Sequence, residues 1–391
     1  MQSLVRGLVL SVALVGMACG GAAAVPDPPR MMVTEVLAGD SVGFARADRP
    51  RAFVFPRDHG IHPDFRTEWW YFTGHLRADA GGEFGFQLTF FRSALTPAPS
   101  ATPDGSAWRP RDIWMAHLAI GDFGGGVFRP YERFARGALG LAGASATTLD
   151  VWLEDWRATA LRPDDPASPI RLVAAEGDVA LDLVLQPQRP PLLQGDQGLS
   201  QKGSRPGSAS YYYSVTRWLA DGTLRLAEET LVVEGAAWMD REWSSSALEP
   251  GQVGWDWFSL QLDDGSDLML YVMRRADGSI DSSSSGTWLS PSGQVHRLES
   301  PEFTVLPTAT WTSRDGVEYP SAWRLEASAL GLQLTVTPRL ADQELRGTFG
   351  YWEGGVRATG SRGGQRIAGR GFVELTGYAI DPAAAGPSPP P

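Results

Sequence analysis

The feature that most constrains this chain is an internal repeat of an aromatic cluster, a glycine turn and an apolar run that ends in arginine. The first copy occupies residues 68–92 and begins with EWWYFTGHL. The second copy occupies residues 254–275 and begins with GWDWFSLQL. Because the two copies lie so far apart, they indicate two related domains rather than a solenoid, whose units are short.

Around this repeat, apolar and polar residues alternate with period two, and no sustained helical period is present. Residues 84–90, 179–185 and 332–336 show the alternation most clearly. This pattern is typical of half-buried antiparallel strands, and the Asp-Gly and Ser-Gly dipeptides between such runs are typical of hairpin turns. We therefore predict an all-β protein whose large sheets stack as sandwiches or close into barrels, since closure removes exposed sheet edges.

The first 24 residues have the layout of a secretory signal peptide, with Arg6, an apolar stretch and a run of small residues. Cleavage after Ala24 gives a secreted or periplasmic protein. Cleavage before Cys19, the only cysteine, gives a lipoprotein that is held to a membrane through that residue. The net charge of −11 argues against a nucleic-acid partner, which requires a basic footprint.

The repeat divides the mature chain into an N-terminal domain at residues 33–230 and a C-terminal domain at 231–380, and we expect a disordered tail at 381–391. If each copy of the repeat opens its domain, Trp69 and Trp255 lie on equivalent strands.

A dense group of charges lies in the sequence WMDREW at residues 238–243, where Asp240, Arg241 and Glu242 stand between two tryptophans. In a cavity of low dielectric, one of these carboxyls would be protonated near neutral pH and would act as a general acid or base. The alternative is a buried arginine–carboxylate pair that joins the domains. Under both interpretations, we expect the three side chains to be buried and hydrogen-bonded to one another.

Two further features have structural alternatives. His59 and His62, with Asp58 and Glu68 nearby, are able to bind a metal, but their placement is loose for zinc. We expect no metal there, and a loop that caps a barrel explains these residues equally well. The 15 tryptophans suit a cavity for an apolar ligand, but a filled core has the same composition.

Seven short motifs follow one another along the mature chain. They are FPxDHxxH from residue 55, EWWYFTG from 68, FQLTFFR from 86, AH from 116, SxKG from 200 with YYS from 212, WMDREW from 238, and FVELTGY from 372. Together they resemble the AttH family of secreted lipocalin-like proteins, which is similar to the carotenoid 1,2-hydratases (hydroxyneurosporene synthases) and to fungal lipocalin-like Diels–Alderases. The resemblance implies two lipocalin-like (calycin) antiparallel β-barrels that pack together, with a ligand cavity in or between them.

The resemblance leaves two functions open. The hydratase branch adds water to a C=C bond without a cofactor, whereas AttH-like proteins are labelled predicted secreted hydrolases and look like companions of ABC-transporter permeases. From the resemblance we accordingly expect a cofactor-free hydro-lyase or hydrolase for a hydrophobic small molecule, or a carrier of a hydrophobic or lipid ligand for an ABC-type export system. Carotenoid hydration itself is disfavoured, because Arg241 and Glu242 replace the His and Asn of the hydratase motif and arginine cannot exchange a proton.

The resemblance also implies which residues form the site. In the enzyme alternative, Asp240 and Glu242 transfer protons and Arg241 fixes their ionisation. The expected ligand-binding residues come from separate motifs and are His59, Glu68, Trp69, Tyr71, Lys202, Tyr212, Trp243 and Trp255.

Overall fold

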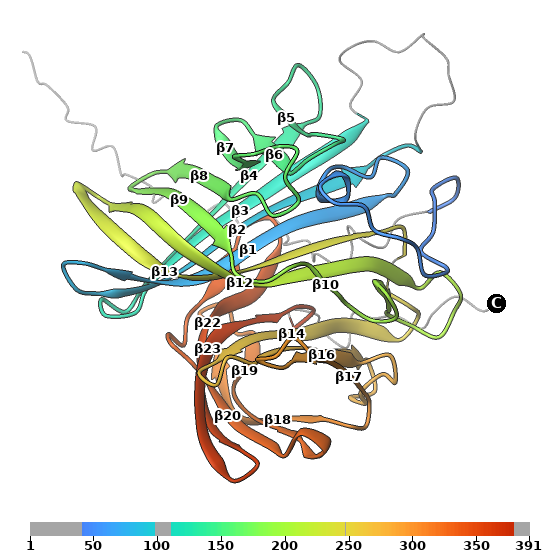
Figure 1. Cartoon of the computed structure of the whole chain (residues 1–391), viewed down its shortest axis with the longest axis vertical. Coiled ribbons are helices and arrows are strands. Elements are labelled where there is room, and N and C mark those ends of the chain that lie inside the picture. Colours follow the sequence, from blue (N-terminus) through green and yellow to red (C-terminus); the bar gives the residue numbers. More distant parts are fainter. Residues whose placement is uncertain (1–40, 98–110, 247, 379–391) are drawn as a thin grey trace, which may run out of the picture.

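The computed structural model describes residues 41–97, 111–246 and 248–378, and Figure 1 shows their arrangement. The first sheet contains β1 (Thr67–Ala78), β2 (Glu83–Ala94), β3 (Asp112–Asp122), β4 (Val127–Arg136), β5 (Ala142–Ala144), β6 (Asp150–Leu153), β7 (Trp156–Ala160), β8 (Ile170–Glu176), β9 (Val179–Pro187), β10 (Leu192–Leu193), β11 (Leu199–Gln201), β12 (Ala209–Leu226) and β13 (Glu229–Ser244). The second sheet contains β14 (Gln252–Leu262), β15 (Asp267–Arg275), β16 (Ser285–Leu289), β17 (Val295–Glu299), β18 (Thr304–Thr312), β19 (Glu318–Ala327), β20 (Leu332–Pro338), β21 (Glu344–Arg346), β22 (Gly350–Arg362) and β23 (Gln365–Leu375). Two 3-10 turns are η1 (Arg57–His59) and η2 (Ser328–Leu330).

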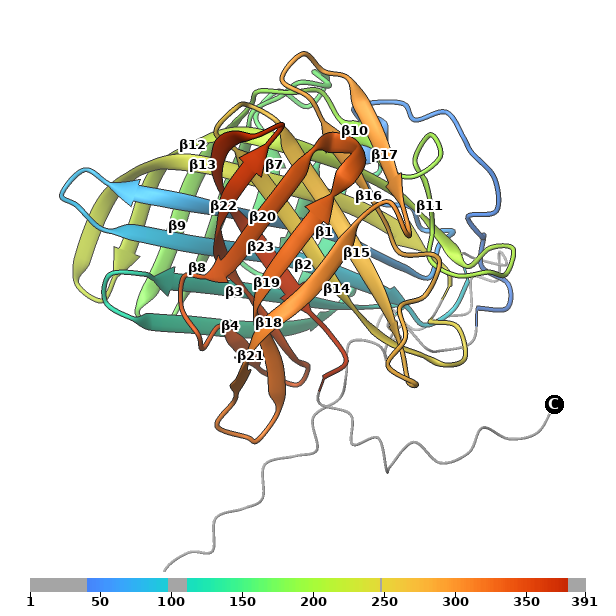
Figure 2. The same cartoon turned by 90° about the horizontal axis from the view of Figure 1, so that it is seen from below.

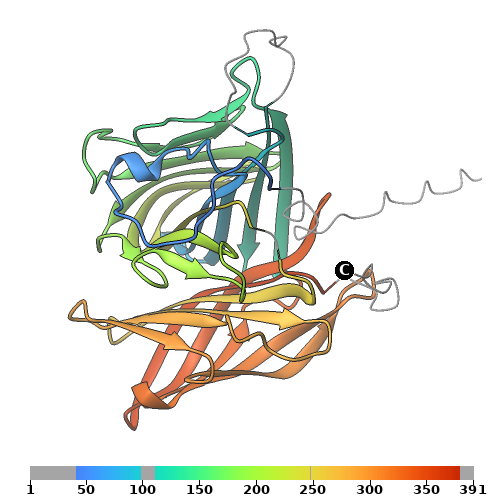
Figure 3. The same ribbon diagram turned by 90° about the vertical axis from the view of Figure 1, so that its right-hand side faces the viewer.

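The described residues form two antiparallel sheets that pack against each other. The first has the order β4-β3-β2-β1-β13-β12-β9-β8-β7-β6-β5, and the second has the order β17-β16-β15-β14-β23-β22-β20-β19-β18. Figure 3 shows the first sheet curled into a nearly closed barrel, with the second beneath it as an open half-barrel. Figure 2 shows the strands of the second sheet crossing those of the first. The predicted all-β, lipocalin-like fold is confirmed, although the second domain remains a half-barrel.

The two sheets share one topology, which accounts for the internal repeat. The opening strand β1 pairs with the next strand, β2, and with the last strand of its sheet, β13. In the same way, β14 pairs with the next strand, β15, and with the last strand, β23. Trp69 and Trp255 lie near the starts of these equivalent opening strands, as predicted.

The predicted domain boundary at residue 231 is wrong. It falls inside β13 (Glu229–Ser244), which pairs with β1 on one side and with β12 on the other. The chain leaves the first sheet only after Ser244 and enters the second at Gln252. The predicted signal peptide, Cys19 and the predicted tail lie outside the described residues.

Period-two alternation gives each central strand two different faces. Within β13, Met239 and Trp243 pack inside the first barrel, whereas Trp238 packs between the sheets. Three apolar clusters result: one inside the barrel, one inside the half-barrel and one between the two sheets. Among the described residues, no helix is long and apolar enough to cross a membrane.

Candidate active site

A cavity of about 120 Å³ lies between the sheets. Its walls come from β1, β2, β12 and β13 of the first sheet and from β14, β15, β22 and β23 of the second. Its buried lining includes Tyr71, Tyr212, Asp240, Glu242, Trp257, Tyr271, Met273 and Glu353. The half-buried side chains that mark its mouth are Trp69, Phe91, Lys202, Ser246, Leu248, Trp255 and Glu374.

Asp240 is one of two carboxyls, with Glu242, that the first sheet places in this cavity. It is 4 % exposed and accepts hydrogen bonds from Tyr212 Oη at 2.6 Å, Ser214 Oγ at 2.5 Å and Trp238 Nε1 at 2.7 Å. Burial raises the pKa of Asp240 to about 7, although the three donors act in the opposite direction. The carboxyl is therefore fixed in orientation and titrates near neutral pH, as a general acid or base requires.

The second sheet contributes a pair of carboxyls, Glu353 on β22 and Glu374 on β23. They are direct cross-strand partners, so their side chains lie next to each other on the face toward the cavity. Glu353 accepts hydrogen bonds from Tyr71 Oη and from Gln87 Nε2, each at 2.5 Å. Burial raises the pKa of Glu353 well above its usual range, and repulsion from Glu374 acts in the same direction. Burial raises the pKa of Glu374 to about 8, and repulsion from Glu242 and Asp240 adds to this effect. The pair therefore keeps at least one proton near neutral pH.

Among the residues that the structure describes, Lys202 is the only cation that lines the cavity, and it is also the only lysine in the sequence. Its Nζ lies 3.4 Å from Glu242 Oε1 and 3.9 Å from the centre of the Tyr271 ring. The ion pair and the cation–π contact hold the ammonium at the mouth. Glu242 is thereby engaged by Lys202, while Asp240 and Glu353 have uncharged donors as partners.

Arg241 does not interact with the side chains of Asp240 and Glu242, contrary to the prediction. Successive residues of a strand point to opposite faces, so Arg241 points into the first barrel, on the side opposite to Asp240 and Glu242. There, its Nη2 donates to Glu68 Oε2 and to the carbonyl of Gly60, each at 2.5 Å. The three residues are buried as predicted, but the expected bonds among their side chains are absent, and Arg241 does not fix the ionisation of the other two.

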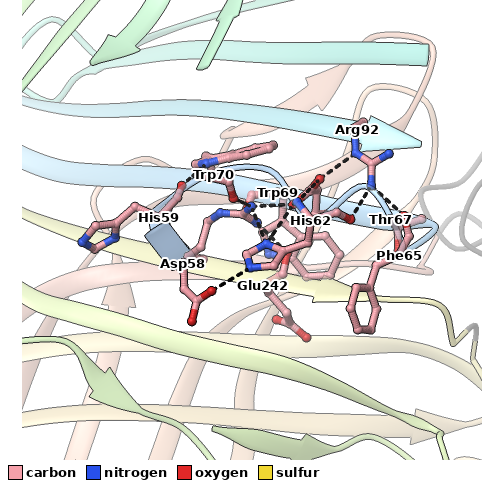
Figure 4. A network of polar contacts seen from close by, with 12 residues as sticks. Asp58, His59, His62, Phe65, Thr67, Trp69, Trp70, Arg92 and Glu242 are labelled. Carbon is pink, nitrogen blue, oxygen red and sulfur yellow. Dashed lines mark hydrogen bonds and ion pairs between the residues drawn. The ribbon is translucent and has the colours of Figure 1, made fainter. Parts of the chain in front are cut away.

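The Arg241 side of β13 is a separate polar network inside the barrel (Figure 4). Glu68 is fully buried between Arg92 and Arg241, and His62 stacks on Trp243 with 3.7 Å between the ring centres. His59 Nδ1 lies 2.5 Å from Tyr213 Oη. Four of the predicted site residues therefore lie away from the cavity: His59, Glu68, Arg241 and Trp243. The motifs predict them at the ligand site, but they lie inside the first barrel.

The same network accounts for the two histidines that resembled a metal site. His62 pairs with Asp58 and Glu68, and His59 is held by its contact with Tyr213. Among the described residues, no group of three or more His, Cys, Asp or Glu side chains is arranged to hold a metal ion.

Seven of the eleven predicted residues line the cavity: Trp69, Tyr71, Lys202, Tyr212, Asp240, Glu242 and Trp255. Sequence reasoning missed the carboxyls of the second sheet, Glu353 and Glu374, and the aromatic rings Trp257 and Tyr271. A signal for Trp257 and Glu374 was present, since Trp257 belongs to the second copy of the repeat and Glu374 to the FVELTGY motif. Glu353 lies in no motif, and only the register of β22 with β23 brings it to the cavity.

The fold and the site define a lipocalin-like protein of two sheets, with acid–base carboxyls enclosed between them. The family model of AttH-like proteins matches residues 46–378, so the chain belongs to the AttH-like family. The crystal structure of a candidate AttH from Nitrosomonas europaea is similar over 86 % of this chain and 100 % of that chain, with 37 % identity and a TM-score of 0.75. Kievitone hydratase from Nectria haematococca shares the fold over 86 % of this chain and 98 % of its own, with 16 % identity and a TM-score of 0.65. The sequence has no match among curated proteins.

Proposed function

We propose that this protein is a cofactor-free acid–base enzyme of the hydro-lyase type, which adds water to, or removes it from, an apolar small molecule held between the two sheets. The observation that carries the proposal is the approach of Asp240 from one sheet and of Glu353 and Glu374 from the other to one aromatic-lined cavity. Kievitone hydratase has the same fold, and the hydration that its name states is the reaction type proposed here.

Hydration of a C=C bond needs an acid that protonates one carbon and a base that takes a proton from the attacking water. Asp240 is the group that we assign as the acid, because it titrates near neutral pH and its position is fixed by three donors. We assign the Glu353–Glu374 pair as the base: once one carboxyl of the pair is ionised, it accepts the proton released by water. The faces of Tyr212 and Trp257 stabilise positive charge that develops on the substrate between these two steps.

The size of the cavity limits what enters it. A volume of about 120 Å³ is of the order of an apolar cavity of about 150 Å³ that binds benzene. The reacting end of the substrate therefore enters the cavity, while the remainder lies at the mouth against Trp69, Phe91 and Leu248.

A hydrophobic-ligand carrier, whether or not it serves an export system, is the competing function. A carrier cavity gains affinity from apolar lining, whereas each enclosed carboxyl costs desolvation free energy. Asp240, Glu353 and Glu374 thus weaken a carrier but are what acid–base chemistry requires. This contrast is the reason that we place the enzyme first.

The test is incubation of the purified protein with a panel of small terpene and prenyl-aromatic alkenes in ¹⁸O-labelled water, followed by mass spectrometry of the products. We expect labelled alcohol from the wild type and none from Asp240→Asn. Glu234→Gln is the matched control, since Glu234 lies on the same strand but is exposed and pairs with Arg77. Equal product from wild type and Asp240→Asn would contradict the assigned role.

Occupancy of the cavity can be measured separately from turnover. Because Lys202 is the only lysine and lies at the mouth, an amine-acylating reagent modifies one side chain of the protein. A ligand that occupies the cavity is expected to slow this modification equally in the wild type and in Asp240→Asn. Protection without product in the wild type would favour the carrier.

A further inference from the structure

A line of polar side chains leads away from the inner end of the cavity, between the two sheets. Gln87 Nε2 donates to Glu353 Oε2 at 2.5 Å and to Tyr351 Oη at 3.0 Å, so one amide holds the two oxygens side by side. A hydrogen bond from the Tyr351 hydroxyl acts to lower the pKa of Glu353 against the larger effect of burial. On its other side, Tyr351 Oη lies 2.7 Å from His117 Nδ1. Glu353, Tyr351 and His117 are therefore consecutive members of one hydrogen-bonded line.

The line ends close to solvent. His117 Nε2 lies 3.2 Å from Glu132 Oε2, and the Glu132 side chain is 15 % exposed, against 1 % for His117. Glu132 also accepts a hydrogen bond from the backbone N–H of Thr348 at 2.7 Å, which fixes its carboxylate. Each interior member is a group that both donates and accepts protons, so the line joins the enclosed carboxyl to the surface.

We propose that Tyr351 and His117 form a proton path between Glu353 and Glu132, by which the cavity exchanges protons with solvent while a ligand fills the mouth. The proposal rests on the proposed function, because it gives Glu353 a proton to take up or lose in each turnover. It adds two positioning and proton-transfer residues, Tyr351 and His117, which do not line the cavity, although the His117 ring packs against Phe91 of the lining with 5.4 Å between the ring centres.

The transfer can be followed bond by bond. While Glu353 is protonated, its O–H donates to Tyr351, the Tyr351 O–H donates to Nδ1 of His117, and the Nε2–H of His117 donates to Glu132. Release then breaks the Glu353 O–H bond and forms a new Tyr351 O–H bond, as the former tyrosine proton passes to Nδ1. The Nε2 proton leaves through Glu132 to water, and uptake runs the same steps in reverse.

A network with a structural role alone would have a fixed direction of donation. The titratable groups that face its two ends are Glu374 on β23, Tyr71 on β1 and Asp240 on β13 near Glu353, and Glu132 on β4 near His117. A proton path can be told from such a network by the protonation of His117 Nδ1. Nδ1 of His117 must be without hydrogen while Glu353 is protonated and must carry hydrogen once Glu353 is ionised.

Nitrogen NMR of protein labelled with ¹⁵N-histidine reads this directly, because a bare ring nitrogen and an N–H nitrogen have different shifts and the chain has 5 histidines. As the pH is raised through the titration of the Glu353–Glu374 pair, we expect Nδ1 of His117 to gain hydrogen. A histidine that titrates independently only loses ring hydrogen as the pH rises. An ordinary single loss of hydrogen from His117 in the wild type would overturn the path.

Two variants and one internal control make the test specific. Glu353→Gln keeps a donor toward Tyr351, so Nδ1 of His117 should stay bare, and Tyr351→Phe should remove the coupling. His59 is the control, since its Nδ1 contacts Tyr213 at 2.5 Å inside the barrel, and its signals should not change in either variant. If Nδ1 of His117 gains hydrogen as the pH rises but the ¹⁸O assay gives no labelled product, the proton path is supported and the proposed reaction is rejected.

Discussion

At the scale of single residues, the buried ion pair of Arg241 and Glu68 makes the strongest prediction about stability. Both side chains are fully buried, so Arg241→Leu leaves the Glu68 carboxylate with Arg92 as its one remaining arginine partner. We expect a loss of roughly 3–5 kcal/mol in the free energy of unfolding, measured by urea denaturation. Arg77→Leu, which breaks an exposed pair with Glu234, should cost about 0.5 kcal/mol or less. Equal effects of the two changes would show that the Arg241 network adds no stability.

In contrast to the Arg241–Glu68 pair, Asp240 is expected to lower the stability of the folded protein, by an amount that depends on pH. Burial raises its pKa in the folded protein to about 7, from the ordinary value of 3.8. Between these two values the folded chain keeps a proton that the unfolded chain has lost, so Asp240 makes the protein less stable as pH rises through this window. Asp240→Asn should remove that contribution and gain roughly 2–4 kcal/mol relative to wild type above pH 7. Parallel stability curves for the two proteins, from urea denaturation at several pH values, would contradict the assigned environment.

At the scale of strands, the sequence predicted which segments form strands better than it predicted where they pair. The domain boundary predicted at residue 231 is wrong because the partners of this segment in β1 and β12 are distant in sequence and leave no local signal. The separation of Arg241 from Asp240 was predictable, since period two alone places them on opposite faces. The place of Glu353 in the cavity could not be predicted from the sequence, because it depends on the register of β22 with β23.

A β-bulge in β12 links one sheet to the other. The register of β12 with β13 shifts between Val215 and Trp218, and as a result both Thr216 and Arg217 reach Asp267, at 2.8 and 2.7 Å. Asp267→Ala removes a fully buried carboxylate and leaves Arg217 and Arg189 without the carboxylate that they share. We expect a loss of roughly 3–5 kcal/mol, measured by urea denaturation. The matched control is Asp182→Ala, which breaks an exposed pair with Arg171. A loss no larger than that of the control would show that this link is not needed for packing of the sheets.

At the scale of the whole molecule, the cavity exists because two sheets of one topology pack their opening strands against each other. The equivalent strands β1 and β14 supply Trp69 and Trp255 to its mouth, and their closing partners β13 and β23 supply Asp240 and Glu374. The internal repeat thus places an aromatic residue and a carboxyl from each half at one site. Neither sheet alone holds the full set of proton-transfer groups.

The central claim is that this cavity transfers protons to carbon rather than only holding a ligand. The most direct measurement is mass spectrometry of the ligand that copurifies with the protein, after incubation of the complex in D₂O. We predict that the wild type returns deuterium-labelled ligand, since reversible protonation exchanges hydrogen even where no net hydration accumulates, and that Asp240→Asn with equal occupancy returns it unlabelled. Recovery of unlabelled ligand from the fully occupied wild type would contradict the account and identify the protein as a carrier.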